Sequence, residues 1–151
     1  MFDRPPHLMK AAQLSALEGP SVLRVADVPV PSDTGRVLIE VRAAGVSYPD
    51  LLMTYGKYQK QVPAPFVPGI EIAGVVAAAP KGSAVSVGVA WGEYVRSNPT
   101  VFRESVDSLA KLIADGLRPH ITARYPLDGA AAALAALERG EIVAKAVLDL
   151  S

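Results

Sequence analysis

Hydroxyl and phenol groups gather in one short segment, residues 47–58, of this 151-residue sequence. Ser47 can donate or accept a hydrogen bond, and Tyr48, Tyr55 and Tyr58 supply three phenols. A phenol beside a reacting carbonyl can hydrogen-bond a developing oxyanion, and its ring can stack on a flat ligand. The same residues can serve structure alone, because serine often ends a strand at a turn and tyrosine often packs with its hydroxyl in water. Both interpretations stay open.

Two carboxylates accompany these hydroxyls in the sequence. Asp50 falls in the first turn of an expected helix, where a carboxylate caps the helix N-terminus, although it could also orient Tyr48 or a ligand. Glu71 falls in an expected apolar strand, where an unpaired carboxylate is costly. We therefore expect Glu71 to have a partner, such as an arginine or backbone amides, and to be structural.

Composition excludes several kinds of chemistry. The chain has no cysteine, and its two histidines, His7 and His120, lie far apart in sequence, so we predict no disulfide, no thiolate nucleophile and no zinc or other metal site. Fifteen basic and fifteen acidic side chains balance without long runs of like charge, which predicts neither a nucleic-acid nor a membrane partner. The N-terminus has no apolar signal-like segment, and we expect a cytoplasmic protein.

The first half of the chain predicts strands around one short helix. Valine-rich and leucine-rich runs predict strands at 10–14, 22–28, 37–43 and 70–79. Residues 47–55 predict a helix with Pro49 in its first turn and Gly56 at its end. Three prolines in residues 61–68 predict an extended loop. Gly74, inside a strand, indicates a bulge or a close backbone approach.

The second half predicts two helices and two strands. Asn98 can cap a helix and Pro99 can take its first position, and we expect this helix to run to Asp115. Its apolar residues recur every three or four positions on one face: Phe102, Val106, Leu109 and Ile113. We then expect a strand at 121–125, a helix at 130–139 and a strand at 145–150.

Three segments together carry a family likeness. Residues 43–52, AAGVSYPDLL, look like an AAGVNxxD segment, and residues 67–76, VPGIEIAGVV, look like a PGxExAGxV signature. Residues 88–151 contain VAWGEY and ARYPL, which look like the stretch that follows a nucleotide-binding domain. The chain thereby resembles the zinc-free medium-chain dehydrogenase/reductases of the NADPH:quinone oxidoreductase, or zeta-crystallin-like, family, from Met9 to Ser151.

The resemblance implies an α+β fold with a GroES-like, partly open antiparallel barrel. We expect a flexible leader at 1–8, the barrel half of the catalytic domain at 9–88, and a long helix with a strand–helix–strand return at 89–151 that packs on the barrel. We expect the family's Rossmann domain to be absent, because Gly88 leads directly into the far segment and no G-x-G-x-x-G occurs.

The family's chemistry is hydride transfer from NAD(P)H to a quinone or another activated carbonyl. Ser47 stands where the family usually has an asparagine near the nicotinamide and the substrate carbonyl, so Ser47 and Tyr48 are the catalytic candidates. Tyr48, Leu52 and Tyr55 are the substrate-binding candidates. NADPH is the implied cofactor, but without a seat for its pyrophosphate we expect this chain alone not to bind it and to be inactive.

The alternative function is a non-catalytic module that self-associates or binds a partner. Loss of a domain should expose apolar surface, which predicts a homodimer in which the segment after Gly88 packs on the partner's barrel, with exchanged elements. The expected contact residues are Trp91, Tyr94, Val101, Phe102 and Leu109.

Overall fold

The computed structural model describes residues 8–32, 37–78 and 98–150. The strands are β1 Leu8–Leu14, β2 Leu23–Pro29, β3 Leu38–Val46, β4 Ile72–Ala78, β5 Ile121–Tyr125 and β6 Lys145–Asp149. The α-helices are α1 Tyr48–Thr54, α3 Pro99–Ala114 and α4 Ala130–Glu138, and the 3-10 turns are η1 Pro20–Val22 and η2 Leu127–Gly129. Every predicted strand and helix is present, with ends that differ by up to three residues. Residues 1–7 of the predicted leader at 1–8 lie outside the described residues, as does the junction with Trp91 and Tyr94, while Leu8 already belongs to β1.

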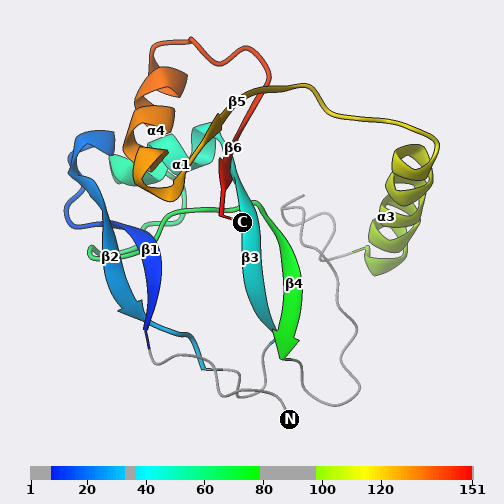
Figure 1. Cartoon of the computed structure of the whole chain (residues 1–151), viewed down its shortest axis with the longest axis horizontal. Helices are drawn as coiled ribbons and strands as arrows, with labels where there is room; N and C mark the ends of the chain where they lie inside the picture. Colours follow the sequence, from blue (N-terminus) through cyan, green and yellow to red (C-terminus); the bar gives the residue numbers. More distant parts are fainter. Residues whose placement is uncertain (1–7, 33–36, 79–97, 151) are drawn as a thin grey trace. The chain divides into compact units, whose positions relative to one another are not determined.

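The six strands form two sheets (Figure 1). β1 and β2 make an antiparallel hairpin, and the second sheet has the order β4-β3-β6-β5. β3 is antiparallel to β4 and β6, whereas β5 and β6 are parallel because helix α4 connects them. The four-stranded sheet is therefore mixed. The strand–helix–strand segment β5–α4–β6 was expected to pack on the barrel strands. Instead, β6 pairs with β3 and becomes part of the same sheet as β3 and β4.

The proline-rich loop at 61–68 is attached to the hairpin. Leu14 donates its N–H to the carbonyl of Phe66 at 2.8 Å, and Phe66 donates back to the carbonyl of Leu14 at 3.2 Å. This single bridge satisfies the backbone of Leu14 at the end of β1 without making the loop a strand. The loop is extended, as predicted, and residues 69–71 connect it to β4.

Helix α4 covers the core. Its alanines allow close packing, and Ala133 and Leu134 are buried against α1 and the hairpin, beside which α4 lies in Figure 1. Leu14 at the end of β1 and Ala146 in β6 are completely buried in the same cluster. The core thus joins both sheets through one alanine-rich helix.

Gly74 lies at both a bulge and a close backbone approach, the two features expected for a glycine at this position. A Cβ at Gly74 would run into the carbonyl oxygen of Glu40 on β3, and the β3–β4 register shifts between Val41 and Ala43, next to Gly74. Only a residue without a side chain lets the two backbones approach so closely.

The chain divides into two compact units, and helix α3 belongs to the second. The described residues 8–32, 37–78 and 121–150 belong to one unit, and the described residues 98–120 belong to the other. Asn98 and Pro99 begin α3, as predicted, and Gly116 follows its end with a φ of 105°. On this helix Leu109, Leu112 and Ile113 are exposed by 41 %, 51 % and 50 %. No helix in the described ranges is long and apolar enough to cross a membrane.

Leu14→Ala should be strongly destabilising, because Leu14 is fully buried between the hairpin, α4 and the loop. Removing its buried methyl groups leaves a cavity and should lower the free energy of unfolding by about 2–5 kcal/mol. Urea denaturation followed by circular dichroism measures the change. Leu8→Ala on the same strand, where Leu8 is 53 % exposed, is the matched control and should stay within about 0.5 kcal/mol of the wild type. If Leu14→Ala and Leu8→Ala lowered the free energy of unfolding equally, Leu14 would not be a core residue.

Candidate functional site

Ser47 forms the corner between β3 and α1. It has an extended backbone, with φ −136° and ψ 163°, and is the N-cap of the helix, and the helix has a proline in its first turn. Its backbone N–H donates to Asp50 Oδ2 at 2.8 Å, and its hydroxyl donates to the same oxygen at 2.7 Å. The predicted capping role of Asp50 is confirmed. The Ser47 hydroxyl is consequently held against a carboxyl group rather than left to rotate in solvent.

Asp50 is almost completely buried, with 4 % of its surface exposed. Its second oxygen, Oδ1, has no hydrogen-bond partner among the described residues. Burial is the main cause of a raised pKa for Asp50, and the charge of Glu71 adds to it, while the hydrogen bonds from Ser47 and the charge of Lys145 lower it. Asp50 therefore holds its proton more tightly than an exposed aspartate does.

Glu71 and Lys145 form an ion pair beside this corner. The antiparallel register pairs Val46 with Ala146, so Lys145, the first residue of β6, comes next to Ser47. Glu71 precedes β4 and its side chain is half-exposed, so the expectation that it lies inside an apolar strand is wrong. The expectation of a partner is right, but the partner is a lysine.

The Glu71 residue packs directly against the backbone of Gly45. The N–H of Gly45 donates to the backbone carbonyl of Glu71 at 3.0 Å, and a Cβ at Gly45 would collide with Glu71 Oε2. Any larger residue would push this carboxylate away from Lys145. Ser47, Asp50, Glu71 and Lys145, here called the Ser47 cluster, thus occupy one end of the four-stranded sheet.

A cavity of about 50 Å³ adjoins the Ser47 cluster. Of the described residues that line it, Asp50 alone has a polar side chain. The walls come from both sheets and from α4, and include Leu23, Ala44, Gly45, Leu134 and Leu148. The cavity is therefore apolar apart from the Asp50 residue in its wall.

The predicted substrate-binding residues lie on α1 and at its end. Tyr48, Leu52 and Tyr55 are spaced by four and three residues, which puts them on one side of the helix. Tyr48 is 61 % exposed, and Leu52 is half-buried. None of the three lines the cavity beside Asp50. Their role in binding stays a prediction.

Tyr55 connects α1 with α4. Its hydroxyl donates to Glu138 Oε1 at 2.8 Å, and this hydrogen bond is the main cause of a raised pKa for the phenol. The Lys57 ammonium lies 5.4 Å from the centre of the Tyr55 ring. The phenol therefore has a structural partner, and its ring is the part that remains available for contacts.

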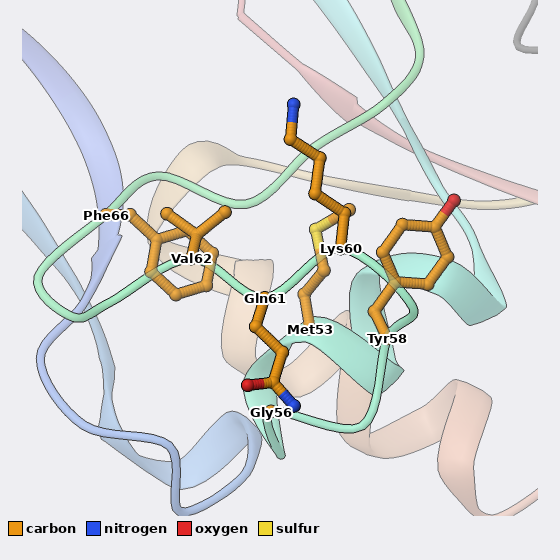
Figure 2. A pocket seen from close by; sticks show the side chains of 7 residues that line it. All are labelled: Met53, Gly56, Tyr58, Lys60, Gln61, Val62 and Phe66. Atoms are coloured by element: carbon orange, nitrogen blue, oxygen red, sulfur yellow. The ribbon is translucent and has the colours of Figure 1, made fainter.

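Tyr58 belongs to a different and smaller hollow. Figure 2 shows it with Met53 and Phe66 among the lining side chains, while the amino end of Lys60 extends away from them. The space measures about 10 Å³, which is room for roughly one water molecule. It is too small for an organic ligand.

Two helix starts in the described residues are closed to a pyrophosphate. The N-terminus of α1 already carries the carboxylate of Asp50 and Pro49 lacks an N–H, while α4 begins at the buried Ala130. That this chain does not bind NADPH stays a prediction. No three histidine, cysteine or acidic side chains converge within the parts that the structure describes. The absence of bound zinc stays a prediction.

Comparison with known proteins agrees with this architecture. A sequence profile of the alcohol dehydrogenase GroES-like domain matches residues 33–143. The quinone oxidoreductase of Lama guanicoe is 38 % identical over 73 residues, which cover 47 % of this chain and 22 % of that protein. Human quinone oxidoreductase is 36 % identical over 74 residues, again 22 % of its length. The structure of a probable oxidoreductase from Mycobacterium abscessus superposes with a TM-score of 0.87 at 21 % identity, covering 96 % of this chain and 100 % of that one.

The profile match spans most of the chain and includes Ser47, Asp50 and Glu71, so the chain belongs to the alcohol dehydrogenase GroES-like domain family. Within that family its relatives include quinone oxidoreductases, which confirms the resemblance found in the sequence. The chain matches about a fifth of the length of these relatives.

Lys145 is the residue of the Ser47 cluster that sequence reasoning missed. In the sequence it is one lysine at the start of a strand, and only the β3–β6 register brings it to Ser47. The cavity was missed for a similar reason, since its walls come from segments distant in the sequence.

Asp50→Asn should change how stability depends on pH. Because the folded-state pKa of Asp50 lies above the ordinary value of 3.8, the folded protein binds this proton more tightly than the unfolded chain does. The contribution of Asp50 to stability is then fully present below the ordinary value and is lost as the pH rises through the folded-state pKa. Relative to the wild type, the asparagine variant should gain stability as the pH rises from about 3 to 7.

Urea denaturation at each pH measures this difference. Asp27→Asn is the control, because Asp27 is an exposed carboxylate that pairs with Lys10 at 2.8 Å on the hairpin. A difference between wild type and Asp50→Asn that stays constant with pH would show that Asp50 titrates as an ordinary aspartate.

Proposed function

We propose that this chain is the catalytic-domain portion of an NAD(P)H-dependent quinone oxidoreductase, which binds a quinone or another activated carbonyl for hydride transfer. The single observation that carries the proposal is the sequence match to the GroES-like family and its quinone oxidoreductases. The Ser47 cluster at one end of the sheet supports it. The two sheets are, in this proposal, parts of a partly open barrel.

Four residues of this chain have defined tasks in the proposal. Tyr48 offers an exposed phenol and ring at the start of α1, where a flat substrate can stack. Leu52 and the ring of Tyr55 continue that side of the helix as apolar contacts. Ser47, whose hydroxyl is held by Asp50, fixes the corner on which the reacting carbonyl rests.

The proposal places NAD(P)H outside the substrate side of the molecule. The match to about a fifth of the length of the quinone oxidoreductases supports a division of labour in which this chain orients the carbonyl compound and another part of the enzyme holds NAD(P)H. Alone, the chain then transfers no hydride.

A non-catalytic, self-associating module is the second candidate function. The observation that favours it is the apolar face of α3, on which Leu109, Leu112 and Ile113 are exposed. Such a row is typical of a helix that packs on a partner. In this proposal a second copy of the chain covers the face and makes a homodimer.

Binding measurements test the first proposal. Titration calorimetry of the chain with NADPH should give no saturable heat. Tetramethyl-1,4-benzoquinone should instead shift amide signals near Ser47 and Tyr48 in nitrogen-15 NMR spectra, because the substrate-side residues are present. Micromolar, saturable binding of NADPH would reveal a cofactor seat in the chain, and unshifted signals with the quinone would refute the proposed substrate class.

Light scattering at low micromolar concentration tests self-association. The wild type should have the mass of a dimer, and Leu112→Lys should shift it to the monomer, because a charge in the centre of an apolar contact is costly. Lys111→Glu on the neighbouring position of α3 changes charge outside that face and should leave the dimer intact. A monomeric wild type would eliminate this second function.

A further inference from the structure

The cavity next to the Ser47 cluster exists because many of its walls are small. Protein interiors are close-packed, and a gap of this kind is bounded by residues that larger side chains would have filled. Five of the described lining residues are alanine or glycine: Ala12, Ala44, Gly45, Gly69 and Ala130. The space measures about 50 Å³, against about 30 Å³ for one water molecule in the liquid. It therefore has room for a group of one or two carbon atoms.

The lining of this cavity runs from the core to the surface. Leu23, Val46 and Leu134 are almost completely buried, with 4 %, 7 % and 4 % of their surfaces exposed. Gly69 is exposed, and its neighbour Pro68 is half-buried. The cavity thus has a buried floor, and a ligand reaches it from the side of Pro68 and Gly69.

The same cavity adjoins the residues to which the proposed function assigns the carbonyl compound. Val46 and Asp50, which lie on either side of Ser47 in the chain, both line it. Gly45 lines it as well, and its N–H donates to the backbone carbonyl of Glu71 at 3.0 Å. A group seated in the cavity would therefore belong to a molecule that also lies against the Ser47 cluster.

The walls favour an apolar occupant over water. A water molecule in a cavity needs two to four polar partners, and among the described lining side chains Asp50 alone is polar. A hydrocarbon group needs no such partner, and its burial is favourable in proportion to the apolar area removed from water. Size and polarity together match a methyl or ethyl group.

We propose that this cavity is a subsite for one methyl or ethyl substituent of the carbonyl compound. The inference rests on the proposed function and narrows its substrate class to quinones, and other activated carbonyl compounds, that carry such a substituent next to the carbonyl. In these compounds the carbonyl carbon and the alkyl-bearing carbon are bonded to each other, which suits a subsite lined by both chain neighbours of Ser47. A bulky substituent such as tert-butyl does not fit the space.

Xenon, an atom close in size to a methyl group, tests whether the cavity accepts an apolar occupant. Xenon dissolved under pressure should shift the carbon-13 methyl signals of Leu23, Leu134 and Leu148 in the intact chain, and the shifts should saturate. Leu8, exposed on β1, is the internal control, and its signals should stay unchanged. Unmoved signals at the three lining leucines, as expected for a cavity that holds water only, would overturn the inference.

Two valine substitutions on β3 separate the cavity from the rest of the strand. Ala44→Val adds two methyl groups at a lining position and should weaken xenon binding at least tenfold. Ala43→Val adds the same groups on the opposite face of β3, because consecutive strand residues alternate, and should bind xenon as the wild type does. Ala12→Val on β1 is a second filling variant for the case in which Ala44→Val does not fold. Xenon binding retained in a folded filling variant would contradict the subsite.

Titration with tetramethyl-1,4-benzoquinone links the cavity to the substrate. The affinity should fall about fourfold in Ala44→Val, the effect of one methyl group that is no longer buried, and should not change in Ala43→Val. Equal affinity for the quinone in the wild type and both variants would overturn the subsite and leave the proposed function standing. Absence of quinone binding to a wild type that binds xenon would instead overturn the proposed function, and with it the assignment of the cavity to that substrate.

Discussion

The pairing of β3 with β6 is the interaction on which the rest of the structure depends. Backbone hydrogen bonds set Val46 opposite Ala146, and this register alone brings Lys145 beside Ser47 and the Glu71 carboxylate. A slip by one residue would turn every side chain of β6 to the other face and separate the ion pair. The same pairing gives α4 a sheet on which to pack, so the core and the candidate site share one origin.

Asp50 combines a capping role with almost complete burial. One of its oxygens accepts two hydrogen bonds from Ser47 and caps α1, which fixes the carboxyl group in place, and the other has no partner among the described residues. The residue also belongs to the wall of an otherwise apolar cavity. Because burial raises its pKa, Asp50 holds its proton more tightly than an exposed capping aspartate does.

Local features of the fold were predictable from the sequence, and its long-range contacts were not. Valine-rich runs and the proline and glycine residues around them located the strands and α1, because those signals act within a few residues. The capping role of Asp50 and the close approach at Gly74 followed from position alone. The parallel β5–β6 pair, the partner of Glu71 and the cavity depend on which distant segments meet, and no periodicity encodes that choice.

The central place of β6 also determines when the sheet can be completed during synthesis. β6 lies between β3 and β5, yet it leaves the ribosome roughly a hundred residues after β3, which gives the sheet contacts of high sequence separation. Until then the inner edge of β3 and the neighbouring β5 have no strand between them. The nascent chain therefore carries the unpaired edge of β3 from the synthesis of that strand until β6 is made, and β5 adds a second unpaired edge only shortly before β6. Such edges can pair with other chains, so the late synthesis of β6 prolongs the time at risk of aggregation.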